Sequence, residues 1–227
     1  MPYSLDRVVP WGRSLDEYQA MFGLSETDLG SLILDCGGGP ASFNAESAAN
    51  GRAVVSVDPL YCASAAAIER RVEDTFDHVM DQMRRNSDDF VWTHVPDVAE
   101  LGRRRMAALR RFIADYPRGK SEGRYVEASL PDLPFESGAF DLALSSHLLF
   151  LSSEQLNVDF HIQAAEEMFR VASEVRIFPL LQIGGTPSPH VAGVVEAFRS
   201  RGAIATIEPV AYEFQRGGNQ MLRLRRK

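Results

Sequence analysis

The sequence predicts an α/β protein with a doubly wound, mostly parallel sheet, and three observations lead to this fold class. Short runs rich in valine, isoleucine and leucine alternate with amphipathic helical patterns along most of the chain. The length of 227 residues, 45% of them hydrophobic, suffices for one sizeable core but hardly for two. The last two apolar runs flank a glycine turn and predict a closing antiparallel hairpin. We therefore expect a single domain over residues 1–227.

The expected elements follow one another in the order of such a fold. A serine cap candidate and apolar residues at helical spacing predict a helix over 14–22, within an N-terminal helical cap formed by residues 1–29. Alternation of strands and helices implies right-handed crossovers, with helices on both faces of the sheet. The expected strands are 31–35, 53–58, 124–128, 140–145, 174–180, 204–214 and 221–225, and the later helices are 42–50, 159–172 and 190–201.

One interval, residues 59–123, is too long for a single crossover helix. Two helices fit into it, at about 62–86 and 97–115, joined by an aromatic segment at 89–94. This helical insertion between the second and third strands is compatible with a lid over the sheet edge and with an additional packing layer.

Composition excludes several classes of partner. The formal net charge of −7 argues against a nucleic-acid-binding surface, which needs a basic face. No apolar run reaches the roughly 18 residues of a membrane helix, and the N-terminus lacks the apolar centre of a signal peptide. Two cysteines and five histidines show neither a disulfide framework nor the spacing of a metal site. We expect a cytoplasmic protein without a metal, nucleic acid or membrane partner.

The predicted first strand runs directly into three glycines, in the sequence ILDCGGGP. Gly37 and Gly39 remove side chains at the sheet edge where parallel folds bind ligands, so the backbone can approach a ligand there. Asp58, at the end of the second strand, can accept both hydroxyls of an adenosine ribose. Ser42 replaces the third glycine of the dinucleotide fingerprint, and Asp35 would repel a pyrophosphate but suits the cations of S-adenosylmethionine. The turn therefore indicates a charged nucleoside.

Five short motifs occur in order along the chain: DCGGG at 35–39, Asp58, VEASLPDLPF at 126–135, SGAFDL at 137–142 and EMFRV at 167–171. Together they resemble the motifs of class I S-adenosylmethionine-dependent methyltransferases, over about residues 30–225 apart from the insertion. The resemblance implies a Rossmann-like sheet with a reversed last strand. It also implies S-adenosylmethionine as cofactor and S-adenosylhomocysteine as product.

The resemblance also implies a set of cofactor-binding residues. The glycines would line the cofactor, the first aspartate would lie near its aminoacyl end, and the second would hold the ribose. Ser129 stands where the family usually has an acid that reads the adenine, and its hydroxyl can still accept a hydrogen bond. The residues assigned to the cofactor are Asp35, Gly37, Gly39, Asp58, Ser129, Leu130 and Ser145.

Residues on the acceptor side should come from the loops at the same sheet edge. In-line methyl transfer chiefly requires alignment of the acceptor, and a base is needed only when the acceptor must lose a proton. His147, after the fourth strand, is the candidate catalytic base because an imidazole titrates near neutral pH, or else it only shapes the pocket. The segment WGR at 11–13 is expected to fold over the site, and Arg216 could position an acidic acceptor. The candidate substrate residues are Tyr61, Phe150, Gln215 and Asn219.

The function predicted from the sequence is methyl transfer to a small-molecule acceptor by in-line displacement. The proline-containing motif of enzymes that methylate DNA amines or protein amides is absent after the fourth strand, which favours a small molecule. Two alternatives remain, an NAD(P)-dependent oxidoreductase and a non-catalytic nucleoside-binding regulatory protein.

Overall fold

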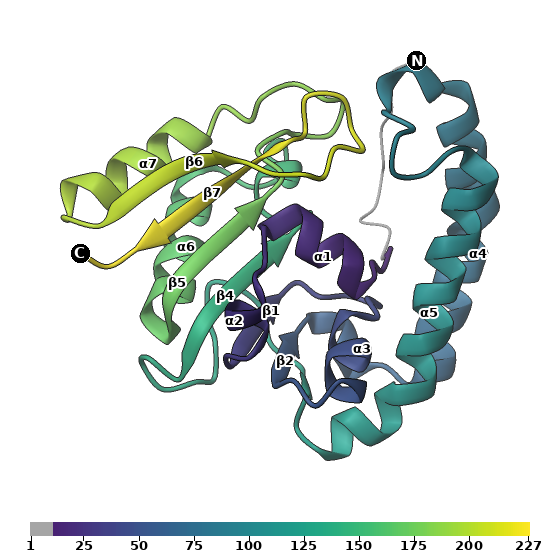
Figure 1. Ribbon diagram of the computed structural model, residues 1–227, viewed down its shortest axis with the longest axis horizontal. Coiled ribbons are helices and arrows are strands. Elements are labelled where there is room, and N and C mark those ends of the chain that lie inside the picture. Colours follow the sequence, from purple (N-terminus) through teal and green to yellow (C-terminus); the bar gives the residue numbers. More distant parts are fainter. Residues whose placement is uncertain (1–10) are drawn as a thin grey trace.

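The computed structural model describes residues 11–227, and within them it confirms the α/β class with a mostly parallel sheet (Figure 1). The described residues form a seven-stranded sheet in the order β3-β2-β1-β4-β5-β7-β6. The first five strands of this order are parallel, and β7 is antiparallel to both of its neighbours. The strands are β1 Ile33–Cys36, β2 Val54–Val57, β3 Tyr125–Val126, β4 Phe140–Ser146, β5 Ala172–Phe178, β6 Ile204–Pro209 and β7 Gln220–Arg225.

Strand β1 lies at the centre of the parallel part, between β2 and β4. All four of its residues are buried, which explains the continuous apolar run that predicted it. From β1 the chain adds β2 and then β3 on one side. It then crosses to the other side of β1, where it adds β4 and β5, so the strand order reverses at β1. Ligands of open parallel sheets bind at the carboxyl edge beside such a reversal.

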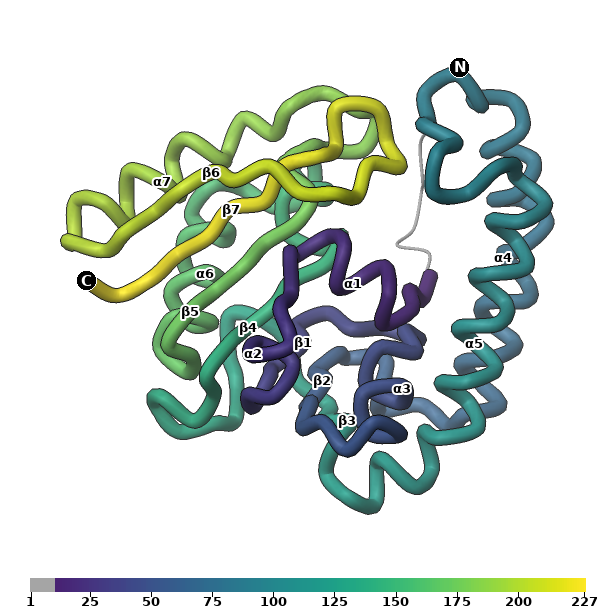
Figure 2. The backbone as a smooth tube through the Cα atoms, viewed as in Figure 1, coloured from purple at the N-terminus to yellow at the C-terminus, as the bar shows by residue number. Residues whose placement is uncertain are grey.

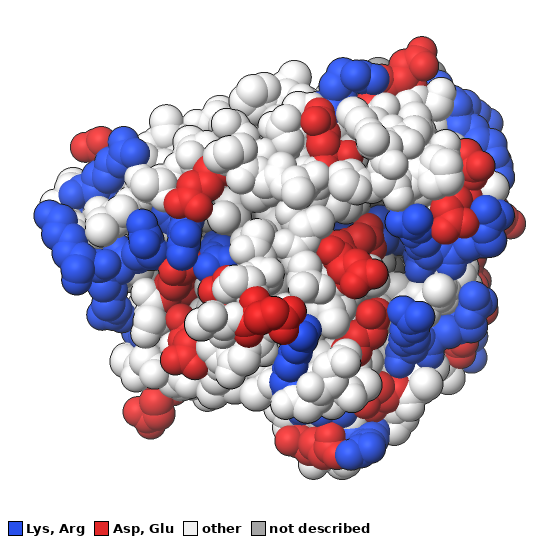
Figure 3. Space-filling model, in the orientation of Figure 1, with Lys and Arg blue, Asp and Glu red and all other residues white. Residues whose placement is uncertain are grey.

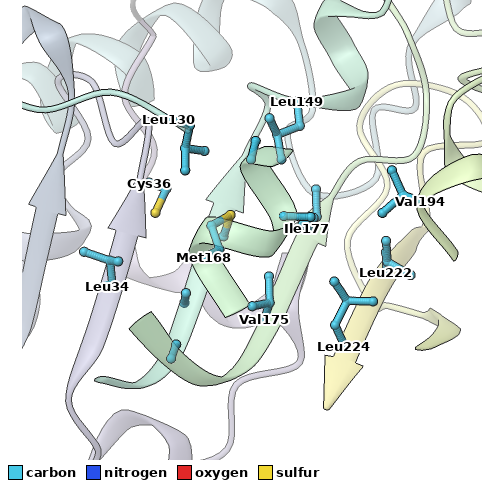
Figure 4. Close-up of a cluster of buried hydrophobic side chains, with 14 of the residues drawn as sticks. Leu34, Cys36, Leu130, Leu149, Met168, Val175, Ile177, Val194, Leu222 and Leu224 are labelled. Atoms are coloured by element: carbon cyan, nitrogen blue, oxygen red, sulfur yellow. The ribbon is translucent and has the colours of Figure 1, made fainter. Parts of the chain in front are cut away.

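Helices cover both faces of the sheet. On one face, α6 (Val158–Val171) and α7 (Val191–Ser200) pack on alternate residues of the strands, among them Leu34, Val175 and Leu222 (Figure 4). On the other face lie α1 (Leu15–Phe22), α2 (Glu26–Leu29) and α3 (Phe43–Ala49), whose apolar side chains form a second core with the remaining strand residues.

The insertion contains the two expected helices, α4 (Ala65–Arg85) and α5 (Val98–Ser121), which stand together beside the sheet (Figure 2). Helix α5 continues to Ser121 rather than ending near residue 115. It does so because Tyr116 and Gly119, in its last turns, are buried against Tyr125 of β3. Short 3₁₀ turns η1 (Pro59–Cys62), η2 (Ser87–Asp89) and η3 (Phe150–Ser152) complete the described elements.

The other strands lie within two residues of their predicted bounds, but β3 and β6 are clearly shorter than the sequence predicted. Strand β3 has two residues instead of five, because the chain after Val126 turns back on itself through a bridge between Ser129 and Asp132. Strand β6 ends at Pro209 rather than near residue 214. Residues 210–219, named here the C-terminal loop, leave the sheet to pack against the segment between α4 and α5.

The visible face of the molecule in Figure 3 has no single basic surface. Lysine and arginine side chains gather at the left of the view, where β7 ends near the C-terminus, and at the right along α4 and α5, where acids lie among them (Figure 3). None of the helices within residues 11–227 combines the length and apolarity that crossing a membrane requires. Of the N-terminal cap expected over 1–29, residues 1–10 lie outside the described residues, and the rest includes α1 and α2.

Candidate functional site

The candidate site is built on the glycine turn where β1 ends. The N–H groups of Gly37 and Gly38 both donate to the carbonyl of Val57, at 2.8 and 3.3 Å, which holds the turn against the end of β2. Gly37 has φ +75° and Gly39 φ +53°, in the left-handed region that favours glycine. The sequence therefore needs glycine at these two positions for backbone reasons alone.

Asp58 lies beside this turn, as the end of β2 requires. Its Oδ2 accepts a hydrogen bond from the Gly39 N–H at 3.0 Å, and its Oδ1 accepts from the Leu60 N–H at 2.8 Å. Burial raises the pKa of Asp58, and the two backbone donors oppose that rise. The carboxylate is half-buried at the sheet edge, and each of its oxygens keeps a lone pair for a further donor.

The three glycines differ in what surrounds them. A Cβ on Gly37 would lie 2.6 Å from Cδ2 of Leu148, and a Cβ on Gly38 would overlap the Asp35 carboxylate. For Gly39 the nearest atom is Oδ2 of Asp58, at an ordinary contact distance of 3.9 Å. Close packing thus explains the first two glycines, a reason the sequence does not reveal, whereas a Cβ on Gly39 would make only this one ordinary contact.

Asp35 is buried beneath the turn rather than exposed in a cleft. Its Oδ1 accepts from the Tyr18 hydroxyl and its Oδ2 from the Ser56 hydroxyl, each at 3.0 Å. Burial raises the pKa of Asp35 to about 7, against the effect of these two donors, and nearby Asp58 adds to the rise. Among residues 11–227, no Lys, Arg or His forms an ion pair with this acid. The charge of Asp35 is thus uncompensated, a setting that suits a cationic ligand.

His147 follows β4 in a left-handed conformation, with φ +55°. Its N–H donates to the Phe178 carbonyl at 2.7 Å, and its Nδ1 is 2.8 Å from the Ser146 hydroxyl. Burial, followed by the charges of Arg13 and Arg105, lowers the pKa of His147 well below its usual range. The imidazole is therefore neutral at physiological pH and a weak base. It is better suited to hydrogen bonding than to proton removal.

Ser145 lies on the other face of β4. It is paired in register with Cys36 and Ile177, two residues of the core under α6. Its hydroxyl is buried and has no hydrogen-bond partner. Side chains alternate along a strand, so Ser145 points away from the face that holds Asp35 and Ser146.

The two residues predicted to flank adenine follow β3 at the same carboxyl edge. Ser129 is exposed, and its carbonyl accepts from the Asp132 N–H at 2.9 Å. Leu130 is buried in the core that Figure 4 draws. Their contact with a nucleoside remains a prediction.

Tyr61 and Phe150 do not line a pocket, which corrects the sequence prediction. Tyr61 is 1% exposed and packs with Phe112 of α5, while its hydroxyl donates to the Gly39 carbonyl at 2.8 Å. Phe150 is also 1% exposed and stacks on His161 of α6, with ring centroids 5.4 Å apart. Both rings therefore belong to buried hydrophobic clusters. Tyr61 also stabilises the glycine turn, through its hydrogen bond to Gly39.

Gln215 and Asn219 bond within the C-terminal loop and its neighbours. The Gln215 amide donates to the Gln182 carbonyl at 3.5 Å, and the Asn219 amide donates to Glu213 at 3.3 Å. None of the hydrogen bonds of the described residues joins either side chain to the glycine turn. Their role toward a substrate remains a prediction.

The segment between α4 and α5 packs on the C-terminal loop. The Val91 N–H donates to the Phe214 carbonyl at 2.7 Å, and the rings of Phe90 and Phe214 stack with centroids 4.9 Å apart. Arg216 donates to the carbonyls of Asp88 and Phe90. Two segments far apart in the sequence are thus joined, an arrangement that fits both a lid and an additional packing layer.

A buried ionic network on the acceptor side was not predicted. Arg105 of α5 donates to both oxygens of Glu17 of α1, at 2.6 and 2.7 Å, and Tyr212 of the C-terminal loop donates to the same carboxylate at 3.0 Å. The sequence analysis identified only a serine cap candidate at the start of α1, and the structure shows that Glu17 also forms a capping box with Ser14. The network ties α1, α5 and the C-terminal loop together beside His147.

The segment 11–13 packs on the residues that follow the glycine turn, and its position over a bound ligand remains a prediction. The Ser42 N–H donates to the Arg13 carbonyl at 3.0 Å, and Gly12 is so close to Pro40 that a Cβ would overlap its carbonyl. Within residues 11–227, no group of three or more His, Cys, Asp or Glu side chains could hold a metal ion.

Comparison with solved structures finds methyltransferases, at low similarity. One is magnesium protoporphyrin IX methyltransferase from Synechocystis PCC 6803 with bound S-adenosylmethionine (TM-score 0.44, 10% identity, 87% of this chain and 71% of that chain). Another is the mitomycin 7-O-methyltransferase MmcR (TM-score 0.49, 11% identity, 94% of this chain and 54% of that chain). The chain thus spans about half the length of MmcR. These scores lie below 0.5, so the fold assignment depends on the strand order and not on these likenesses.

No protein-family model matches the sequence. A relative covers nearly the whole chain: the uncharacterized protein MJ0045 of Methanocaldococcus jannaschii is 32% identical over 224 residues, which are 98% of each chain. The reversed β7 agrees with the antiparallel last strand expected from the sequence. The chain belongs to the same family as MJ0045.

Proposed function

We propose that this protein binds S-adenosylmethionine and transfers its methyl group to a small-molecule acceptor by in-line displacement. The observation that carries the proposal is the pairing of Asp58 with the Gly39 N–H at 3.0 Å, at the carboxyl edge beside the reversal of strand order. A carboxylate fixed in this way presents its remaining lone pairs beside Gly39. It can there accept the two hydroxyls of a ribose.

The charge at the turn favours a sulfonium nucleoside over a dinucleotide. Asp35 is a buried acid without a cation, which a positively charged aminoacyl end would compensate and a pyrophosphate would not. The start of α3 is also unsuited to phosphate. Its Ser42 N–H is taken by the Arg13 carbonyl, and its Ser42 hydroxyl by Glu46. These contacts count against the NAD(P)-dependent alternative.

When bound, S-adenosylmethionine would supply a methyl group on an already activated leaving group. The task of the chain is then to hold the nucleoside and align the acceptor. Asp58 would hold the ribose, Asp35 would compensate the aminoacyl end, and Ser129 with Leu130 would flank the adenine. Leu148 must rotate its side chain away for a ligand to touch Gly37, since it now lies against that glycine.

His147 would orient the acceptor rather than deprotonate it. Its imidazole is neutral and can accept a hydrogen bond from an acceptor hydroxyl or amine, but its lowered pKa makes it a poor base. The proposal therefore fits acceptors that lose their proton to water after methylation, or that enter the site already deprotonated.

Transfer of labelled methyl groups tests the proposal. The protein is incubated with methyl-tritiated S-adenosylmethionine and a fractionated cell extract. Label should then appear in the small-molecule fraction with wild type and with Asp16→Asn, which changes an exposed acid of α1. Asp58→Asn should lose most of this transfer. Label that appears only in protein or nucleic acid would contradict the acceptor class. Enhanced fluorescence of NADH on mixing, without cofactor binding, would favour the oxidoreductase.

A further inference from the structure

The segment before α1 contains hydrogen-bond donors that have no acceptor. Among residues 11–227, the buried Nε of Arg13 has no partner, and its guanidinium makes one hydrogen bond, from Nη1 to the Trp11 carbonyl at 3.3 Å. The indole Nε1 of Trp11 is likewise buried without a partner. Buried donors are nearly always paired in folded proteins, so two unpaired donors within three residues indicate a missing acceptor.

The acid nearest to Arg13 is fully used by other groups. The Glu17 carboxylate accepts hydrogen bonds from Nη1 and Nη2 of Arg105, from the Tyr212 hydroxyl and from the Ser14 N–H. Burial and the charge of Arg105 lower the pKa of Arg13, whereas the Arg105–Glu17 contacts raise that of Arg105. Of the two arginines one is thus neutralised, and Arg13 forms no ion pair with the acids of residues 11–227. The cluster therefore has a surplus of one positive charge.

This surplus lies at the candidate site. The backbone of Arg13 is bonded to Ser42, directly after the glycine turn, and its charge is close enough to His147 to lower the pKa of that imidazole. The segment that carries the free donors therefore lies against the residues that directly follow the glycine turn, the turn that would hold the nucleoside.

We propose that Arg13 and Trp11 form a recognition site for a carboxylate carried by the small molecule that binds at this edge. An arginine fork matches the two oxygens of a carboxylate, and an indole N–H adds a third donor. The inference rests on the proposed function and deepens it. The carboxylate comes from one of two sources, the aminoacyl end of the cofactor or an acidic acceptor.

The first arm of the experiment compares two nucleosides by calorimetry. S-adenosylhomocysteine carries the aminoacyl carboxylate, and methylthioadenosine lacks it while keeping the ribose and adenine. If the cofactor supplies the carboxylate, Arg13→Gln should weaken the binding of S-adenosylhomocysteine by roughly tenfold or more and leave methylthioadenosine unchanged. Arg13→Lys keeps the charge but not the two-pronged guanidinium, so its affinity for S-adenosylhomocysteine should lie between those of wild type and Arg13→Gln. Arg103→Gln removes an exposed arginine of α5 and should behave as wild type.

The second arm tests an acidic acceptor. With the cofactor site saturated by S-adenosylhomocysteine, benzoate, acetate and inorganic phosphate are titrated against wild type and Arg13→Gln, with neutral benzamide as the matched probe. If the acceptor supplies the carboxylate, benzoate or acetate should bind wild type and not Arg13→Gln, and benzamide should bind neither.

Either pattern supports the inference and names the source. The inference is overturned if wild type and Arg13→Gln bind both nucleosides equally and neither takes up a carboxylate probe. Stronger binding of phosphate than of any carboxylate, lost in Arg13→Gln, would contradict the assigned ligand class. Failure of wild type to bind either nucleoside is a different result, since it contradicts the proposed function itself.

Discussion

Asp35 is a carboxyl group beneath the glycine turn, with two neutral hydroxyl donors and no ion-pair partner among residues 11–227. A group in this setting holds its proton up to a pH near 7 in the folded protein but only to about 3.8 in the unfolded chain. Since the native state then binds the extra proton, the free energy of unfolding falls as the pH rises between these two values. At pH values well above 7, the contribution of Asp35 to the free energy of unfolding no longer changes with pH.

The Asp35→Asn variant should lack this loss. We expect wild type to lose up to about 4 kcal/mol relative to Asp35→Asn between pH 4 and pH 7. Urea unfolding of both proteins at several pH values measures the difference, in which the opposite contributions of buried His147 and His161 cancel. Parallel stability curves for the two proteins would show that Asp35 titrates normally.

Asp58 is the residue on which nucleoside binding should depend most. Asp58→Asn keeps an oxygen for the Gly39 N–H but removes the charge that would accept ribose hydroxyls. Because each charge-assisted hydrogen bond contributes about 1.5–3 kcal/mol, the affinity for S-adenosylhomocysteine should fall at least tenfold. Calorimetry against the Asp16→Asn control measures this change. An unchanged affinity would mean that the ribose is held elsewhere.

Residue patterns predicted the glycine turn and the position of Asp58, because both follow from where strands end. These patterns did not distinguish residues that line a pocket from residues that are buried in a hydrophobic core. Tyr61 and Phe150 have the same local sequence signals as lining residues, and only the three-dimensional packing of α5 and α6 shows that both are buried. The Arg105–Glu17 pair was also unpredictable, since its partners lie 88 positions apart.

At the scale of elements, α1 is fixed to α5 by this buried ion pair. Glu17→Gln leaves Arg105 and Arg13 without a neutralising charge in a desolvated place, and should lower the free energy of unfolding by roughly 3 kcal/mol. Glu100→Gln, which changes a half-buried acid of α5 in surface ion pairs with Arg103 and Arg104, is the matched control and should have little effect. Equal effects of the two substitutions in urea unfolding would contradict a structural role for the buried pair.

The contact between the glycine turn and the loop after β4 is open to a double-mutant cycle. Gly37→Ala should cost about 1–3 kcal/mol, because its Cβ meets Leu148 and its φ of +75° strains alanine. In a Leu148→Ala background the steric part should disappear and only the strain remain. Urea unfolding of the four proteins measures the coupling, and an identical cost in both backgrounds would exclude the packing explanation for Gly37.

Helices and buried strands were predicted closely, because their periodicity and caps are local signals. The ends of α5 and β6 were not. Helix α5 is extended by burial of Tyr116 against distant Tyr125, and β6 is cut short where the C-terminal loop turns toward Phe90. Such boundaries are decided by tertiary contacts that a single sequence does not reveal.

At the scale of the whole molecule, the strand order places every predicted cofactor residue at or near one sheet edge. The connecting segment of the insertion packs on the C-terminal loop, and α5 supplies Arg105 to the ion pair with Glu17. The same edge combines an uncompensated acid below the turn with an uncompensated arginine above it. This arrangement suits a ligand that carries both an ammonium and a carboxylate beside a nucleoside.

Calorimetric titration of the folded protein with S-adenosylmethionine tests the central claim most directly. The account predicts saturable binding at a single site per chain, displaced by S-adenosylhomocysteine and weakened in Asp58→Asn. A folded protein that releases no heat with millimolar S-adenosylmethionine would contradict it.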